Sequence, residues 1–165
     1  MTKKLVALVM ALMMLLSVTA LAETADTSDW ATYNFEDAQL TISCPADMAA
    51  VELTDEQTEA GICFATAAAD GSLSMAVYCF DPEGATLADA QAEMETTEGY
   101  QCAANQVNGI DVVAFSTVAN ETAVLGCLVM GADGYVYQFM FMPTNDAGTQ
   151  MADQIISTLN VLKAE

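Results

Sequence analysis

From Trp30 onward, short runs of alternating apolar and polar residues recur between turn-forming residues. Two such runs, 30–35 and 39–44, are joined by three residues, and the second places Leu40, Ile42 and Cys44 on one face. Pro45 ends this run, because proline has no N–H to donate to a neighbouring strand. The pattern predicts two early strands, followed over 46–60 by an acidic loop with a helical turn after Thr54.

Three two-residue turn signals then separate pairs of strand-like runs. Asn-Gly and Asp-Gly tolerate the positive φ angles of a type I′ turn, whose twist suits antiparallel strands. The expected hairpins join 62–68 to 72–80 at Asp70-Gly71, 100–107 to 110–118 at Asn108-Gly109, and 124–131 to 135–142 at Asp133-Gly134. The short connection 119–121 predicts that the second hairpin continues into the third as a meander.

Helical patterns fill the two remaining segments. Thr86 is a predicted N-cap with Asp89 three residues later, and Gly99 is a natural stop. Leu87, Ala90, Gln91 and Met94 then follow at helical spacing. The second helix is capped by Thr144 or Asn145, has Asp146 in its first turn, and presents an apolar face of Met151, Ile155, Ile156 and Leu159.

The last hairpin indicates how the elements are layered. A two-residue turn at 133–134 pairs residues whose numbers sum to 267. One face then carries Leu128, Met130, Tyr137 and Phe139, and the other carries Leu125, Cys127, Val129, Val136, Met140 and Met142, with Gln138. Since both faces are apolar, both need cover. With two helices to supply it, the expected fold is α+β, an antiparallel sheet of hairpins covered by helices on both faces in a three-layer sandwich.

The order of these elements resembles a known family. The similarity lies in the early strand ending at Ser43-Cys44-Pro45, the mid-chain helix, the Val107-Asn108-Gly109 hairpin, the aromatic strand 135–139 and the closing helix 155–159. These features resemble the PsbP-like group of small domains, which has a Ran-binding cytosolic branch, a thylakoid branch and exported bacterial members. The resemblance covers most of 30–162 and implies an antiparallel sheet between helices. It implies no functional residues, because no catalytic motif matches.

The first 22 residues are typical of a secretory signal. Lys3 and Lys4 precede an unbroken apolar stretch, Leu5 to Leu16, and Ala20-Leu21-Ala22 supplies a small-x-small cleavage site. The alternative is an uncleaved anchor, but 5–22 only just reaches the length that a bilayer needs. We expect cleavage after Ala22, a short polar leader over 23–29, a single domain over 30–165 and a secreted product without a stable membrane anchor.

Charge and composition exclude several functions. The chain has 23 acids, three bases and no histidine, and all 23 acids follow residue 22, so the expected mature chain with Lys163 alone carries 1 − 23 = −22. Nucleic-acid binding needs clustered Lys and Arg, which are missing. Without histidine, Ser-His-Asp and Cys-His nucleophiles and histidine-ligated zinc or haem are excluded.

Five cysteines lie in the exported part, namely Cys44, Cys63, Cys79, Cys102 and Cys127. Export permits disulfides, and an odd number leaves at least one thiol unpaired in a monomer. The Asp70-Gly71 turn places Ile62 opposite Cys79, and a one-residue change would bring Cys63 there. The favoured interpretation is five small buried hydrophobes, with a Cys63–Cys79 bridge as the alternative.

The carboxylates and sulfur groups suggest other chemistries. Glu56 with Glu59, or Glu93 with Glu95, could serve glycoside hydrolysis, although a solvated anionic surface explains them better. No Asp-x-Asp-x-Asp-Gly calcium loop occurs, so only weak divalent-cation binding is expected. Met140-x-Met142 with Cys127 could hold Cu(I), and the aromatics Tyr135, Tyr137, Phe139 and Phe141 could bind a ligand, but packing in the sheet is favoured for both sets.

These patterns together favour a secreted, non-enzymatic binding or accessory module without cofactors. Its acidic surface favours basic proteins or cations as partners. A carboxylate-based extracellular hydrolase and a weak divalent-cation-binding protein are the alternatives.

Overall fold

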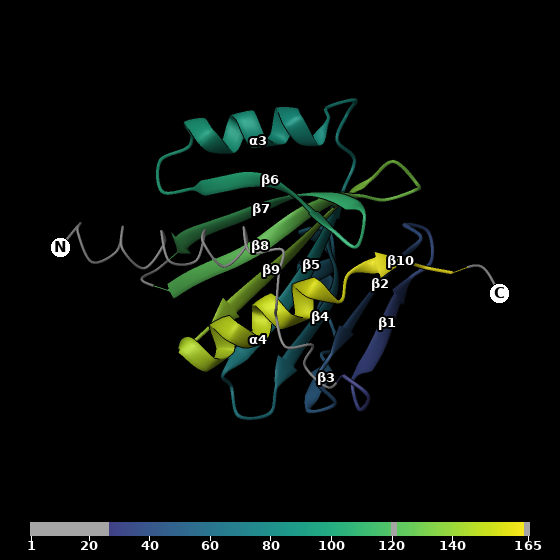
Figure 1. The fold of residues 1–165 in the computed structure, drawn as a ribbon, viewed down its shortest axis with the longest axis vertical. Helices are drawn as coiled ribbons and strands as arrows, with labels where there is room; N and C mark the ends of the chain where they lie inside the picture. The colour runs from purple at the N-terminus through teal and green to yellow at the C-terminus, as the bar shows by residue number, and fades with distance from the viewer. Residues whose placement is uncertain (1–26, 120–121, 164–165) are drawn as a thin grey trace.

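The structure is a computed structural model that describes residues 27–119 and 122–163. The expected signal over 1–22 and the turn residues 120–121 lie outside this described part. Most strands form one antiparallel sheet of seven (Figure 1). Its order is β3 (Met48–Ala50), β4 (Ile62–Ala68), β5 (Leu73–Phe80), β9 (Val136–Pro143), β8 (Thr122–Met130), β7 (Ile110–Ala119) and β6 (Gln101–Val107). The predicted meander from the second to the third hairpin is confirmed by the adjacency of β6, β7, β8 and β9.

The two early strands are confirmed, but they form a separate small sheet. β1 (Ala31–Phe35) pairs with β2 (Leu40–Cys44), which in turn pairs with β10 (Asn160–Val161) near the end of the chain. The predicted loop over 46–60 contains the short strand β3, which was not predicted. It also contains the expected helical turn, α2 (Asp55–Glu59), capped by Thr54.

Both longer helices begin at predicted caps. α3 (Leu87–Thr96) starts after Thr86, whose side chain accepts from the Asp89 N–H while the Asp89 carboxylate accepts from Thr86. α4 (Asp146–Ser157) starts after Asn145, whose side chain accepts from Gly148. α3 ends at Thr96, before the predicted stop at Gly99. Among the described residues, none of the helices is both long and apolar enough to cross a membrane.

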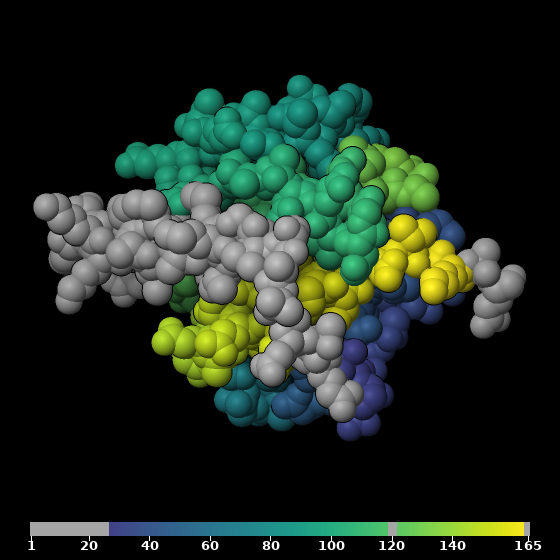
Figure 2. All heavy atoms as spheres, in the orientation of Figure 1, coloured from purple at the N-terminus to yellow at the C-terminus, as the bar shows by residue number. Residues whose placement is uncertain are grey.

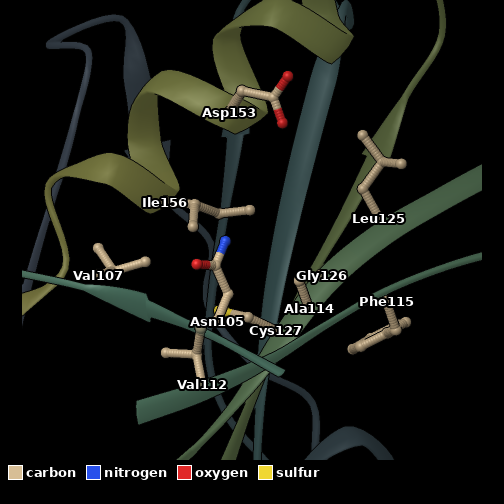
Figure 3. A pocket seen from close by; sticks show the side chains of 10 residues that line it. All are labelled: Asn105, Val107, Val112, Ala114, Phe115, Leu125, Gly126, Cys127, Asp153 and Ile156. Atoms are coloured by element: carbon tan, nitrogen blue, oxygen red, sulfur yellow. The ribbon is translucent and has the colours of Figure 1, made fainter. Parts of the chain in front are cut away.

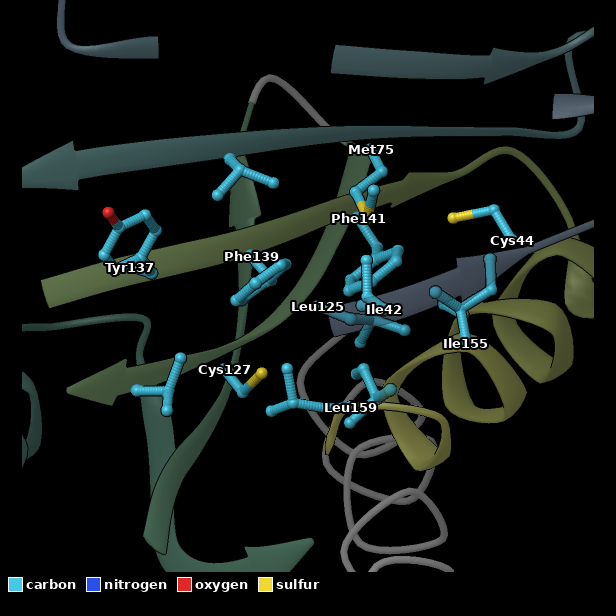
Figure 4. Close-up of a cluster of buried hydrophobic side chains, with 14 of the residues drawn as sticks. Ile42, Cys44, Met75, Leu125, Cys127, Tyr137, Phe139, Phe141, Ile155 and Leu159 are labelled. Atoms are coloured by element: carbon cyan, nitrogen blue, oxygen red, sulfur yellow. The ribbon is translucent and has the colours of Figure 1, made fainter. Parts of the chain in front are cut away.

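The main core lies on the side of the sheet that carries α4 and the small sheet (Figure 4). Phe139 and Phe141 of β9 are fully buried there, against Ile42 of β2 and Ile155 of α4. On the other side, Leu87, Ala90 and Met94 of α3 pack against a smaller cluster that includes Phe115 and Leu128. No side chain of α3 is fully buried, and its atoms form an exposed ridge in Figure 2. The fold is therefore α+β and dominated by antiparallel strands.

The predicted register of the last hairpin is wrong by one residue. Leu125 lies opposite Phe141 and Met130 opposite Val136, so paired numbers sum to 266 instead of 267. The Gly131 N–H donates to the Tyr135 carbonyl at 2.8 Å, which closes a three-residue turn in place of the predicted two-residue turn. Since side chains alternate between faces, this slip moves every residue of β9 to the opposite face from the one predicted.

As a result, the aromatic residues of β9 share a face with Cys127, while its methionines lie on the other. Tyr137, Phe139 and Phe141 belong to the main core with Cys127, whereas Met140 and Met142 belong to the cluster beside α3.

The other two hairpins show where turn signals are sufficient. At Asn108-Gly109 the two-residue turn is confirmed, with Val107 opposite Ile110. In the first hairpin the predicted register holds from Phe64 opposite Val77 to the turn. A β-bulge between Ile62 and Phe64 then shifts it, so Ile62 lies opposite Tyr78. The Cys79 N–H instead donates to the Gly61 carbonyl at 2.9 Å, and neither Ile62 nor Cys63 lies opposite Cys79.

Candidate functional site

A shallow pocket lies between α4 and the half of the large sheet formed by β6, β7 and β8 (Figure 3). The space that the pocket encloses is only about 20 Å³, and the larger volume of about 360 Å³ includes open solvent at the mouth. Ligand pockets usually range from about 300 to 1,000 Å³. The hollow is therefore much smaller than a ligand pocket, and a group bound there would lie mostly at its mouth.

The alternation of side chains along β6, β7 and β8 supplies the sheet side of the pocket. Asn105 of β6 lies opposite Val112 of β7, which lies opposite Val129 of β8. These residues face α4, as do Leu125 and Cys127 of β8. Because most of these side chains are aliphatic, the floor of the pocket is apolar.

α4 forms the other wall because it packs off-centre on the sheet. Ala152 and Ile155 point into the main core and are fully buried. Asp153 and Ile156 lie three residues apart on the neighbouring stripe of the helix and line the pocket. Figure 3 shows Asp153 on α4 at one side and Asn105 on β6 at the other, with Cys127 below Asn105.

Among the described residues, Asp153 is the only acidic side chain of the lining. Burial raises the pKa of its carboxyl to about 6, since a charged group loses hydration in the pocket. Burial also raises the pKa of the Cys127 thiol to about 12, so this sulfur stays protonated at neutral pH. The pocket therefore holds one carboxylate and no activated nucleophile among the described residues.

The acidic pairs considered for hydrolysis lie elsewhere. Glu56 and Glu59 are exposed on α2, and Glu93 and Glu95 are exposed on α3. None of the four lines the pocket. In the described part of the chain no three His, Cys, Asp or Glu side chains gather closely enough to hold a metal ion.

The sequence alone does not distinguish Asp153 from the many other acids that are spread along the chain. The sequence does indicate that Asp153 lies at the edge of an apolar helix face, because it is close to Ile155 and Ile156 on the helix. The sequence does not show that β6 and β7 extend beyond α4, so that the pocket lies between these strands and the edge of the helix that carries Asp153.

The sulfur and aromatic residues are mostly packing groups. All five cysteines carry free thiols, and Cys44 and Cys127 are buried as expected. The expectation of five buried cysteines is wrong at Cys63, which is exposed, and Cys79 and Cys102 are only partly buried. Cys127 lies on the opposite face of the sheet from Met140, so the two do not form a copper site. Tyr137 is buried, as are Phe139 and Phe141, which confirms packing for these three, whereas Tyr135 is 42% exposed.

No protein-family model matches the sequence, and neither does any curated protein. Solved structures match the fold at 14% identity. Cyanobacterial PsbP (CyanoP) of Synechocystis sp. PCC 6803 has a TM-score of 0.61, covering 87% of this chain and 98% of that one. A protein of Bacteroides thetaiotaomicron VPI-5482 has a TM-score of 0.55, and the match covers 82% of this chain and 49% of the Bacteroides chain.

LpqN of Mycobacterium tuberculosis, described as involved in cell envelope biogenesis, has a TM-score of 0.45 at 14% identity, with coverage of 74% of this chain and 82% of that one. At such identity the likeness to CyanoP concerns the arrangement of helices and strands. This arrangement agrees with the family resemblance inferred from the order of elements, and the chain has a PsbP-like fold.

Proposed function

We propose that this protein is a secreted, non-enzymatic binding or accessory module that holds its partner at the pocket between α4 and β6–β8. The observation that carries the proposal is the chemistry of the lining, in which the described residues supply one carboxylate, Asp153, and mostly apolar side chains. Hydrolysis of a glycoside by the common route needs two carboxylates across one cleft. An apolar hollow with one or two orienting polar groups is instead typical of a binding site.

Two further features support this proposal. The first 22 residues have the pattern of an export signal, which favours a site of action outside the cytoplasm. The strongly negative surface favours basic partners, because it attracts cations over distance and repels other acidic polymers. In this proposal α3 and α4 cover opposite faces of the sheet, and the opening beside α4 is the binding face.

The location is tested by mass spectrometry of the protein recovered outside the expressing bacterial cells. We expect a mature N-terminus at Glu23. A retained N-terminal segment on cytoplasmic protein would contradict the secreted location.

The binding site is tested by titrating the labelled protein with basic, neutral and acidic short peptides while recording backbone NMR spectra. We expect shifts concentrated at Val107, Asp153 and Ile156. Val107→Trp fills the pocket and should abolish these shifts. The matched control Val118→Trp, on the exposed end of β7, should leave them unchanged. Spectra of both variants without peptide verify the fold.

The non-enzymatic character is tested with the same preparations on peptide, ester and glycan substrates. We expect no turnover above the buffer rate. Reproducible hydrolysis that is lost in a Glu56→Gln, Glu59→Gln double variant or a Glu93→Gln, Glu95→Gln double variant would overturn the proposal in favour of a carboxylate hydrolase.

A further inference from the structure

We propose that the mouth of the pocket receives a protonated primary amine on an aliphatic stem, such as a lysine side chain of a partner, with the ammonium at Asp153 and the stem against Ile156 and the apolar floor. This inference rests on the proposed binding function and specifies the ligand class of the same site. It is argued from the placement of one carboxylate at the edge of an aliphatic hollow.

The first argument is the state of Asp153. Its side chain is half-buried on α4, and burial acts on it without a compensating hydrogen bond or opposite charge among the described residues. Between residues 5 and 162 the sequence holds no lysine or arginine. No element of the large sheet can therefore provide a cation for this carboxylate. A ligand that brings a cation would form an ion pair, which offsets the hydration that the carboxylate loses on burial.

The second argument is the shape and polarity of the lining. The ammonium group of lysine is compact and has three hydrogen-bond donors. It is attached to a chain of four carbons, which readily packs against apolar surface. The pocket supplies apolar surface, because Ile156 lies on the same helix as the carboxylate and Val107 and Val112 line the part of the pocket beyond Asn105 (Figure 3). The amide of Asn105 is the other polar side chain of the lining.

The third argument separates an amine from other ligands. A bare metal ion would need several oxygen or sulfur ligands, and the described residues hold no such group. An anion would be opposed by Asp153 and by the net charge of the whole chain, which is −20. A planar guanidinium needs room for its wide fork, while a compact ammonium fits a narrow hollow better.

The binding should depend on pH through Asp153. From β8 the pocket faces it with the Cys127 thiol, which remains protonated below pH 8, and from β6 with Asn105, which does not titrate. The nearest acid in α4 is Asp146, which is exposed in the first turn of the helix. The amine needs an ionised Asp153, so affinity should fall about tenfold from pH 7 to pH 5.

The test uses capped tripeptides of the form Ala-X-Ala in which X is lysine, arginine, norleucine or glutamate, titrated by NMR in about 150 mM NaCl, where diffuse attraction is screened. Norleucine keeps the stem and lacks the ammonium. We expect the lysine peptide to bind at least tenfold more tightly than the norleucine peptide. Asp153→Asn should remove that advantage, and Asp146→Asn, with the same change of charge on the same helix, should retain it.

The outcomes separate this inference from the proposed function. Equal binding of lysine and norleucine peptides, unaffected by Asp153→Asn, would overturn the ligand class while leaving a binding pocket. A tighter arginine or glutamate complex, or a lysine complex with no pH dependence between 5 and 7, would also overturn it. Failure of all four peptides to shift pocket resonances would do the same, and the broader peptide panel with Val107→Trp would still decide the proposed function.

Discussion

The Asn108 side chain, in the turn between β6 and β7, donates from Nδ2 to the Leu159 carbonyl oxygen at 2.8 Å, just beyond the end of α4. The same nitrogen donates to the Ser157 carbonyl at 2.9 Å. One amide thus donates to two carbonyls, that of Ser157 at the end of the helix, where the last carbonyls lack helical partners, and that of Leu159 just after it. This contact joins the two walls of the pocket at one end, since β6 carries Asn105 and α4 carries Asp153.

Replacing Asn108 should therefore loosen α4 from the sheet. Asn108→Gly keeps the left-handed backbone, which has a φ of +50° at this residue, and removes both hydrogen bonds. We expect the free energy of unfolding to fall by about 1–2 kcal/mol, measured by urea denaturation. Asn108→Ala should cost about 1 kcal/mol more, because alanine is strained at positive φ. A glycine variant as stable as the parent would show that the two bonds contribute nothing.

The sequence predicted those parts of the fold that depend on neighbouring residues. The Thr86–Asp89 cap and the Asn108-Gly109 turn use contacts within four residues, so their residue types carry the information. The register of β8 and β9 depends on a turn in which the Asp133 carboxylate accepts from the Tyr135 N–H and the Tyr137 hydroxyl. The dipeptide Asp-Gly occurs in both two-residue and three-residue turns. It therefore does not indicate that the hydrogen bonds of Asp133 favour the three-residue turn.

The candidate site was beyond the sequence for a different reason. Asp153 is one of 23 acids, and its local pattern resembles that of any residue at the edge of an apolar helical face. It becomes distinct only because β6 and β7, about 45 residues earlier, extend past α4 and shield it from water. Contacts at this separation leave no pattern within a single segment of the chain.

The raised pKa of Asp153 makes a prediction for the pH dependence of stability. In the folded protein its pKa is about 6, above the value near 4 of an unfolded chain. The folded state therefore binds the proton more tightly, so this residue favours folding at pH 4 and that contribution is lost as the pH rises to 6. Asp153→Asn should raise the free energy of unfolding by about 1–2 kcal/mol at pH 7 and by much less at pH 4.

The matched control for this measurement is Asp146→Asn, which removes the same charge from an exposed position in α4. It should lower stability slightly at pH 7, because a carboxylate in the first turn favours the helix dipole. Equal effects of the two variants at both pH values would contradict a burial effect at Asp153. Carboxyl NMR titration of Asp153 gives the pKa directly.

The five thiols should differ in their reaction with a water-soluble alkylating reagent. Cys63 is exposed and should be labelled first in the native protein. Burial raises the pKa of Cys44 and Cys127 to about 12, so both should stay unlabelled until the protein unfolds. Mass spectrometry of digested samples gives the site of each label. Fewer than five labels after denaturation without reductant would reveal a disulfide and contradict the free thiols of the structure.

Gly126 of β8 permits a close approach that no other residue type allows. It lies opposite Phe115 of β7, and a Cβ built at Gly126 would be 2.6 Å from the Phe115 ring and would also meet the Phe139 carbonyl oxygen. The backbone oxygen belongs to the β9 ladder and cannot move aside easily. Gly126→Ala should therefore lower the free energy of unfolding by about 3 kcal/mol.

Gly84 offers the comparison, because a Cβ there would meet nothing within 4 Å although its φ is +89°. Gly84→Ala should cost about 1 kcal/mol, from backbone strain alone. The NMR shifts of the Phe115 ring should change in Gly126→Ala and remain unchanged in Gly84→Ala. Since Phe115 also contributes to the pocket lining, its displacement in Gly126→Ala should weaken ligand binding as well as stability, and intact binding in a destabilised variant would place the ligand away from this ring.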